Sequence, residues 1–382
     1  MARKPSNTFH LRNLGPIGDV SLDLGDLTLL VGPQGTGKSI ALQLFKLALD
    51  RLAIAKTARD NGLVWKSARD FLDVYLGSGL GRSLTQGYEI VWKGKPVALP
   101  PQNRNEPGSP QVFYIPAQRS LTVADGWPRA FSSYSAAPFV VREFGLTLQE
   151  LLLGGPGETL FPASNRLKAG LRNAVNESVF HSGSLQLRVQ SHQREMKLVH
   201  GKAELPYMAW SAGQREFAPL LLALYKLLPA AAKAKDGHVD WVIIEEPEMG
   251  LHPQAILATM SLVMDLLHRG YQVMLSTHHP LVLDVVWLIR ELQANKGKPQ
   301  DLLKAIDLPR RQDLVKMAES VLQRSCRVFE FRHGDGGVVS TDISSLDPFA
   351  EDEATAGWGG LTGHSARVQD VVSAVVSQGG AE

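Results

Sequence analysis

The chain has 382 residues, with 40 lysines and arginines against 38 aspartates and glutamates, so its formal net charge is +2. Hydrophobic residues make up 44% and charged residues 20%, which is ordinary for a folded protein and excludes a disordered polyelectrolyte. The balanced charge also argues against a wholly basic nucleic-acid binder, because the bulk charge supplies no strong attraction for phosphate.

The single cysteine, Cys326, cannot form a disulfide within the chain, which favours a reducing compartment. The first residues carry positive charge with no apolar core behind it, so we expect no signal peptide. The most apolar stretch, over 220–228, is far shorter than the ~20 residues that cross a bilayer. We therefore expect a cytoplasmic protein without membrane contact.

Apolar patterning predicts alternating strands and helices. In the first half we expect strands over 7–14 and 20–31, a helix over 39–51, a hairpin over 88–99, a proline-rich loop over 100–110 and a strand over 111–115. In the second half we expect helices over 166–180, 212–228, 254–269, 280–294, 312–324 and 366–377, a hairpin over 184–199, and strands over 241–244, 271–275, 326–332 and 337–342.

Residues 32–39, GPQGTGKS, match the phosphate-binding pattern GxxxxGK[ST] and stand between a predicted strand and a predicted helix. In this pattern the glycines let backbone N–H groups surround phosphates, and the helix N-terminus adds positive potential. The lysine reaches the β and γ phosphates, and the hydroxyl binds Mg²⁺. We therefore expect ATP and Mg²⁺ to be bound by Gly32, Pro33, Gln34, Gly35, Thr36, Gly37, Lys38 and Ser39.

The apolar strand over 241–244 ends in two carboxylates, Glu245 and Glu246. Adjacent residues of a strand point to opposite sides, so one carboxylate can face a metal while the next faces water. We assign Glu245 to the Mg²⁺ shell and Glu246 to activating the attacking water.

The helix over 212–228 begins with Ser211, Ala212, Gly213 and Gln214. The serine is a good N-cap, and the small residues permit a close backbone approach. Taken alone, this segment is also explained by helix capping.

Together these motifs resemble an ABC-type ATPase head of the SMC/RecF/OLD branch. The resemblance rests on residues 32–39, the SAGQ of 211–214, the EEPEMGLHP of 245–253 and the STHHP of 276–280, which occur in the order of such a head. It implies a P-loop α/β fold with a mixed central sheet, an antiparallel β subdomain and a short helical insertion.

The resemblance also implies that two heads enclose two ATP molecules. Ser211, Ala212, Gly213 and Gln214 then correspond to the signature segment, which contacts the γ-phosphate bound by the opposite subunit. The loop over 249–252 corresponds to the place where heads touch each other. We therefore expect a homodimer or a higher homo-oligomer.

Three further assignments follow from the resemblance. His278 matches the switch histidine that contacts the γ-phosphate, with His279 as a structural neighbour. Gln118 is the candidate for the glutamine that reaches the metal. Arg12 and Asn13 resemble a pair that approaches the nucleotide.

Competing readings are weaker. His252, His278 and His279 lack the spacing of a zinc site. The 104 residues after His278 contain no Asp-x-Asp, so no nuclease domain of the OLD type is expected. The signature form and the spacing also argue against a transporter subunit.

We expect four units: an N-terminal ATPase lobe over 1–120, a helical and β insertion over 121–205, a C-terminal ATPase lobe over 206–330 and an acidic segment over 331–382. The insertion is too short for a long SMC arm. Its stretch over 166–202 has seven lysines and arginines against two acids, so it is a candidate contact for nucleic acid or for an acidic partner.

These features favour an ATPase that acts as a sensor or scaffold for a separate effector, a toxin or a nuclease, in bacterial anti-phage defence. In this respect the chain resembles the ATPase subunit of the PARIS system, and Septu- and retron-associated ATPases are similar to it as well. The alternative is a RecF-like DNA-repair clamp. The Glu-Glu ending of the strand over 241–244 is unlike the Asp-Asp ending usual in RecF-like proteins.

Overall fold

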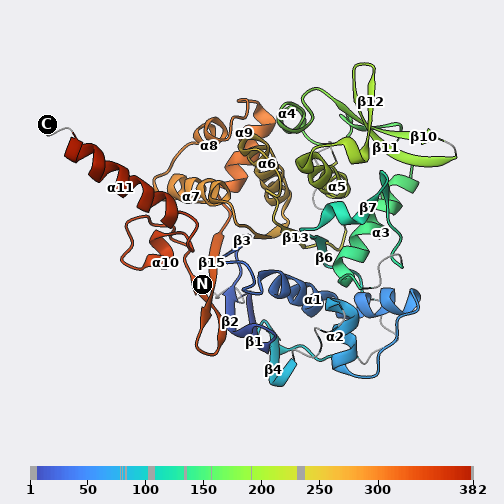
Figure 1. Ribbon diagram of the computed structural model, residues 1–382, viewed down its shortest axis with the longest axis horizontal. Helices are drawn as coiled ribbons and strands as arrows, with labels where there is room; N and C mark the ends of the chain where they lie inside the picture. Colours follow the sequence, from blue (N-terminus) through green and yellow to red (C-terminus); the bar gives the residue numbers. More distant parts are fainter. Residues whose placement is uncertain are drawn as a thin grey trace.

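A computed structural model describes residues 7–77, 79, 81, 84–101, 108–132, 136–155, 157–190, 192–229 and 237–379 (Figure 1). Most of the proline-rich loop expected over 100–110 lies outside the described residues.

Ten of the described strands form one mixed sheet, in the order β5-β4-β1-β2-β16-β15-β3-β14-β13-β6. Their bounds are Thr8–Leu14 (β1), Ile17–Asp23 (β2), Leu27–Val31 (β3), Leu84–Trp92 (β4), Lys95–Pro96 (β5), Val112–Ile115 (β6), Trp241–Glu245 (β13), Gln272–Ser276 (β14), Cys326–Gly334 (β15) and Gly337–Asp342 (β16). Strands β15, β3, β14, β13 and β6 are parallel neighbours, whereas β1 pairs antiparallel with β2 and β4. The expected α/β class with a mixed central sheet is confirmed.

Alternate side chains of the central strands pack on opposite faces of the sheet. On β13, Val242 and Ile244 enter one hydrophobic core, while Trp241 and Ile243 enter the other. Helices on both faces bury this apolar surface, which is why the sequences of these strands are continuous runs of hydrophobic residues.

Two groups of helices cover the two faces (Figure 1). One face carries α1 (Lys38–Asp60) and α2 (Ala68–Leu76). The other carries α5 (Ala212–Leu227), α6 (Pro253–Arg269), α7 (Pro280–Ala294), α8 (Pro299–Ala305) and α9 (Gln312–Val321).

The insertion between β6 and α5 forms its own small layer. A four-stranded antiparallel sheet has the order β12-β11-β10-β9. The helices and strands of the insertion are Val123–Ala124 (β7), Trp127–Pro128 (β8), Phe139–Leu153 (α3), Thr159–Phe161 (β9), Ala169–Val175 (α4), Ser184–Gln190 (β10), Gln193–His200 (β11) and Ala203–Pro206 (β12).

Two element predictions were wrong in detail. The single strand expected over 20–31 is divided into β2 and β3, because the chain bends at Asp26, whose carboxylate accepts hydrogen bonds from Ser325. The helix expected over 166–180 begins only at Ala169, since Leu167 has a φ of 57°, and its last turn over 176–180 widens to π geometry.

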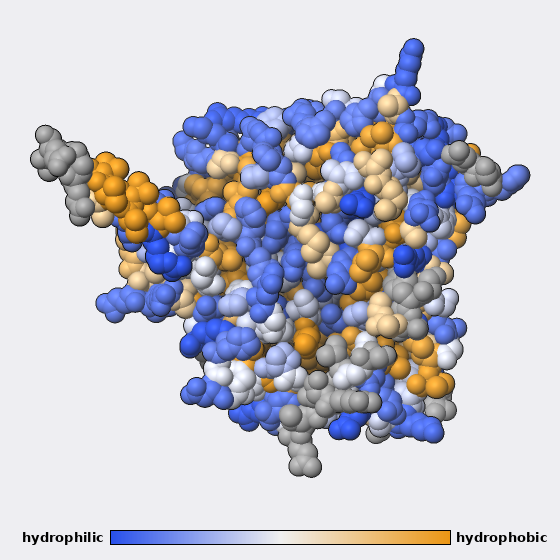
Figure 2. Space-filling model, viewed as in Figure 1, coloured by the Kyte–Doolittle hydropathy of each residue, from blue (hydrophilic) through white to orange (hydrophobic). Residues whose placement is uncertain are grey.

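The C-terminal part completes the sheet and then leaves it. The expected boundary between residues 330 and 331 falls inside β15, so the sheet continues through it. Helix α10 (Glu353–Ala356) follows, and α11 (Gly363–Gly379) projects from the body (Figure 1). Figure 2 shows apolar surface on this projection, and its exposed side chains are Val368, Val371, Val372, Val375 and Val376. Among the described helices, no helix has both the length and the apolar character needed to cross a membrane.

Candidate nucleotide site

The P-loop, residues 32–39, joins β3 to α1. Gly32, Gly35 and Gly37 have φ values of 124°, 78° and 78°, a region that favours glycine. A Cβ at Gly32 would lie 2.2 Å from the carbonyl oxygen of Phe331 on β15. The glycines that the motif requires are therefore also required by the local backbone.

Lys38 is buried in this loop. Its Nζ donates hydrogen bonds to the carbonyl oxygens of Gly32 (2.8 Å) and Pro33 (2.7 Å). Burial lowers the pKa of Lys38 to about 8, and the nearby Glu246 carboxylate acts in the opposite direction. The ammonium is thus held over the P-loop and close to the acidic end of β13.

Glu245 is the last residue of β13, and its side chain is buried. Its carboxylate accepts hydrogen bonds from the Ser39 hydroxyl and from the hydroxyl of Tyr114 on β6. Burial raises the pKa of Glu245, and these two hydrogen bonds oppose that shift. A hydroxyl and a carboxylate are the hard oxygen ligands that Mg²⁺ takes beside phosphates and water, so this donor set fits Mg²⁺.

Glu246 follows in a strained conformation, with a φ of 43°. Its N–H donates to the carbonyl oxygen of Ser276 (2.9 Å), and its Oε1 lies 3.9 Å from Nε2 of His278. Burial, and then the charge of Lys38, lower the pKa of His278, so its imidazole is neutral at pH 7. Lys38, Glu246 and His278 therefore meet at one point.

The topology explains this meeting. Strand β14 lies between β3 and β13, and all three are parallel. Their carboxyl ends therefore share one edge, which is where ligands bind in open α/β sheets. The P-loop follows β3, Glu246 follows β13, and His278 follows β14.

The structure adds a residue that the sequence analysis missed. Arg119, 1% exposed, donates hydrogen bonds to the carbonyl oxygens of Glu245 (2.8 Å) and Glu246 (3.0 Å) and, on α5, of Glu216 (3.1 Å). Its neighbour Gln118, the expected metal ligand, is exposed and begins the short 3-10 helix Arg119–Thr122 (η2). Within this segment it is thus the arginine that contacts the end of β13.

Glu248 is a second residue that was missed. Its Oε1 accepts hydrogen bonds from the Thr277 hydroxyl (2.7 Å) and from the backbone N–H of His278 (2.8 Å). The buried carboxylate thus fixes the turn that carries His278. A carboxylate three residues beyond Glu245 was visible in the sequence, but its partners just after the end of β14 were not.

The segment Ser211–Gln214 forms a capping box at the start of α5. The Ser211 hydroxyl accepts from the N–H of Gln214, and the Gln214 side chain accepts from the N–H of Ser211 (both 3.2 Å). This segment lies apart from the P-loop (Figure 1), so one chain does not bring the two together. Ser211 and Ala212 are exposed.

A close backbone contact ties this segment to the loop over 249–252. A Cβ at Gly213 would lie 2.5 Å from the carbonyl oxygen of Gly250, whose own φ is 70°. The two segments expected to face a second copy therefore pack on each other within one chain.

Arg12 and Asn13 lie at the end of β1. Arg12 donates to the carboxylate of Asp19 (3.1 Å), and the Asn13 side chain donates to the carbonyl oxygen of Gly87 (3.3 Å). The following turn approaches the P-loop, since a Cβ at Gly37 would lie 3.1 Å from Pro16. The pair is thus near the P-loop, but its polar groups are bonded elsewhere.

The basic stretch over 166–202 is largely engaged within the chain. Lys168 forms an ion pair with Asp265, Arg188 with Glu204, and Lys197 with Glu195. Backbone carbonyls accept hydrogen bonds from the guanidinium groups of Arg166, Arg172 and Arg194. The three ion pairs offset part of the positive charge of this stretch, and the carbonyls occupy hydrogen-bond donors of the three arginines.

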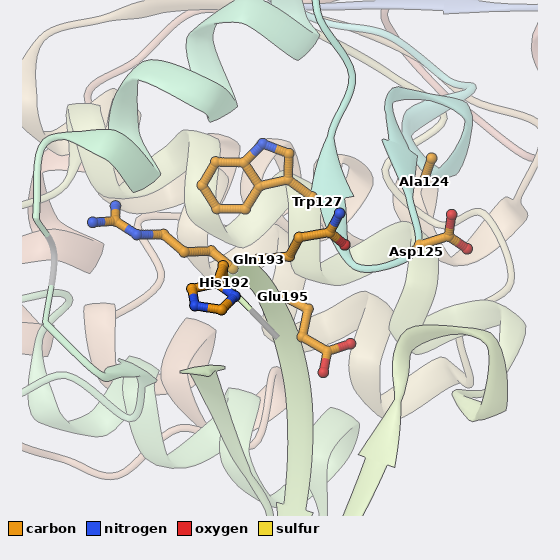
Figure 3. Close-up of a pocket in the computed structure, with 7 residues that line it drawn as sticks. Ala124, Asp125, Trp127, His192, Gln193 and Glu195 are labelled. Carbon is orange, nitrogen blue, oxygen red and sulfur yellow. The ribbon is translucent and has the colours of Figure 1, made fainter. Parts of the chain in front are cut away.

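A pocket of about 800 Å³ opens between the β7–β8 turn and β11 (Figure 3). It is lined by Ala124, Asp125, Trp127, His192, Gln193, Arg194 and Glu195. None of the residues predicted for the nucleotide site lines it.

A P-loop after one parallel strand and paired carboxylates after another define a P-loop nucleotide-binding fold. A family model described as "AAA domain, putative AbiEii toxin, Type IV TA system" matches residues 104–284. This match includes the signature segment, the end of β13 and His278, and it begins after the P-loop. No curated protein matches the sequence.

Two solved SMC heads are similar at low identity. The SMC head bound to the C-terminal winged-helix domain of ScpA has a TM-score of 0.40 and 10% identity, over 88% of this chain and 97% of that one. The SMC head domain from Thermotoga maritima has a TM-score of 0.35 and 11% identity, over 88% and 98%.

A transporter subunit is also similar. CbiO1 from Clostridium perfringens, part of an ABC transporter complex, has a TM-score of 0.31 and 12% identity, over 71% of this chain and 78% of that one.

Proposed function

We propose that this protein binds and hydrolyses ATP at a site shared between two copies of the chain. The observation that carries the proposal is the meeting of Lys38, Ser39, Glu245, Glu246 and His278 at one edge of the sheet. Phosphoryl transfer needs mostly positioning and charge stabilisation, and this edge supplies both.

Each residue then has a role. The P-loop N–H groups and Lys38 hold the phosphates of ATP. Ser39 and Glu245 hold Mg²⁺, which when bound neutralises charge on the phosphate oxygens. Glu246 accepts the proton of the attacking water, and the neutral imidazole of His278 lies beside it, within 3.9 Å.

The Ser211–Gln214 segment completes the site from a second copy. Its Ser211 and Ala212 are exposed, the segment is remote from the P-loop of its own chain, and a serine hydroxyl at a helix N-terminus suits a phosphate. ATP binding would then favour closure of the dimer, and hydrolysis would reopen it.

We further propose that this cycle controls a separate effector, a toxin or a nuclease, in bacterial anti-phage defence. The family description that matches residues 104–284 names a toxin–antitoxin system, which supports a role in a system of this kind. Binding of nucleic acid is less supported, because three of the seven basic residues over 166–202 form ion pairs within the chain.

The hydrolysis proposal is tested by replacing Glu246 with Gln. Removing the base should reduce the hydrolysis rate by on the order of 10²–10⁴-fold, while ATP affinity stays within a few-fold. Single-turnover hydrolysis and fluorescent-nucleotide binding measure the two quantities. Glu291→Gln, on the outer part of α7, is the matched control and should hydrolyse ATP normally.

An unchanged hydrolysis rate in Glu246→Gln would show that Glu246 does not activate the attacking water. Lys38→Ala should lose ATP binding itself.

Co-purification with the products of adjacent genes tests the effector role. Tight, salt-sensitive binding of gapped DNA by the protein alone would instead favour the RecF-like alternative.

A further inference from the structure

We propose that Arg119 is a positioning residue that links the two halves of the shared site. In each chain it fixes the turn of Glu246 at that chain's own nucleotide, and through Glu216 it fixes the Ser211–Gln214 segment that serves the other copy. This inference rests on the function proposed above.

The guanidinium of Arg119 occupies a cage of carbonyl oxygens. Besides the three hydrogen bonds given above, it donates to the carbonyl oxygen of Pro116 (3.3 Å), and its Nε lies 3.7 Å from the carboxylate of Glu216. The guanidinium thus contacts four carbonyl oxygens that belong to three different segments of the chain. A planar fork of donors can satisfy them together, whereas the single ammonium of a lysine cannot.

The first arm of this link holds Glu246. A residue other than glycine persists at a φ of 43° only where its surroundings over-determine it. Here the carbonyl oxygen of Glu246 accepts from Arg119 (3.0 Å) and from the N–H of Met249 (3.1 Å), and its N–H is bound to Ser276. Arg119 therefore helps to aim the side chain that activates water.

The second arm holds α5. Glu216 lies in the second turn of this helix, and its carboxylate accepts hydrogen bonds from the N–H and the hydroxyl of Ser120. The N–H of Arg215 donates to the carbonyl oxygen of Ser211 (3.0 Å), so the helix continues without a break to its cap. Arg119 and Ser120 thus contact α5 at Glu216, five residues or about 7.5 Å along the helix from Ser211.

A second contact connects the Glu246 turn with the Ser211–Gln214 segment. The loop over 249–252 continues from the Glu246 turn and touches Gly213 through Gly250. A shift of the Glu246 turn therefore reaches the signature segment by two routes, through Arg119 and Glu216 and through Gly250.

A mixed dimer separates the two arms. One chain carries Lys38→Ala and so offers only its Ser211 segment; the other carries Ser211→Arg and so offers only its P-loop. Mixing them should restore one working site. Arg119→Lys is then placed in one chain or the other, and single-turnover hydrolysis is measured.

In either chain, Arg119→Lys should lower the hydrolysis rate by on the order of a hundredfold, because a misplacement of about 1 Å in a catalytic site can cost a factor of this size. The ATP concentration for half-maximal rate should change little. A loss confined to the chain that offers the P-loop, or no loss in either chain, overturns the link. If mixing restores nothing even with Arg119 intact, the shared-site function fails instead.

Amide hydrogen exchange on the single variant tests the link without the dimer. Arg119→Lys should exchange faster in two places, over 211–217 and over 246–249, and unchanged exchange in either place overturns the proposal. Glu216→Gln, which keeps the shape and removes the charge, should loosen the 211–217 segment if Arg119→Lys does not fold.

Arg269→Lys is the matched control. Arg269 is also a buried arginine, bonded to Asp265 and to the carbonyl oxygen of Pro229. It ends α6 just before β14 begins, at the edge of the sheet opposite to the P-loop. Its substitution should change neither the hydrolysis rate nor exchange over 211–217.

Discussion

Tyr114 holds the carboxylate of Glu245 from the neighbouring strand β6, and both side chains are buried. Groups that orient a metal ligand in this way typically contribute 10–100-fold to metal affinity. We therefore predict that Tyr114→Phe raises the Mg²⁺ concentration for half-maximal ATP hydrolysis by on the order of tenfold. A Mg²⁺ titration of the hydrolysis rate at saturating ATP measures the shift.

The same core offers a control for this substitution. Tyr75 is equally buried, and its hydroxyl donates to the carbonyl oxygen of Gln43 (2.7 Å) and not to a proposed metal ligand. Tyr75→Phe should lower the free energy of unfolding by about 1–3 kcal/mol, as loss of a buried hydrogen bond does, and leave the Mg²⁺ dependence unchanged. Equal Mg²⁺ curves for both variants would show that Tyr114 is only structural.

Among individual residues, the sequence predicted those that belong to local motifs but not the hydrogen-bond partners that lie far away in the chain. Lys38, Ser39 and Glu245 belong to segments whose chemistry is encoded in a few adjacent residues. Tyr114 and Arg119 act on groups more than 90 residues away in the chain, and such pairing depends on which strands become neighbours.

At the scale of elements, α5 depends on a glycine at its start. Gly213→Ala would place a methyl group 2.5 Å from the carbonyl oxygen of Gly250, and neither side of this contact is a flexible side chain. The Ser211 segment or the loop over 249–252 must therefore move. We predict that the variant stays folded but loses ATP-dependent dimerisation, measured by light scattering in a Glu246→Gln background.

Gly170→Ala provides the comparison for this substitution. Gly170 is also a buried helical glycine, but its new methyl group would meet the end of the Leu314 side chain, which can move. It should dimerise with ATP as the parent does. Dimerisation of Gly213→Ala at the same ATP concentration would contradict a role for this contact in closure.

Most elements were predicted from periodicity, whereas their boundaries were set by contacts. The strands β13 and β14 and the helix α5 stand within a few residues of their expected positions. Helices α2, α3 and α8 were not predicted. The division of β2 from β3 depends on Ser325, which is 299 residues distant from Asp26, and no local pattern reports it.

At the scale of the whole molecule, the small net charge conceals an uneven distribution. Residues 330–382 hold nine acids and two arginines, so the rest of the chain is net positive. The sheet ends within this segment, and the projecting α11 follows it. The C-terminal part therefore combines structural strands with an exposed acidic and apolar extension, a division that composition alone did not reveal.

The lone cysteine reports on the stability of this whole sheet. Cys326 begins β15, pairs with Leu27 of β3 and is 5% exposed. Burial raises the pKa of its thiol to about 12, and Arg290 only partly opposes this. At pH 8.5, near the ordinary thiol pKa, its thiolate fraction should be on the order of a thousandfold below that of the unfolded chain. Alkylation should therefore require opening of the sheet.

ATP should slow that opening, because β3 leads directly into the P-loop. At an ATP concentration one hundred times the Kd, binding stabilises the native state by about 2.7 kcal/mol. We predict that Mg²⁺ and ATP slow alkylation of Cys326 in Glu246→Gln by on the order of a hundredfold, measured by mass spectrometry at pH 8.5. Lys38→Ala should show no such protection. Rapid labelling of the native protein would mean that the β15–β3 pair opens locally, without unfolding of the whole sheet.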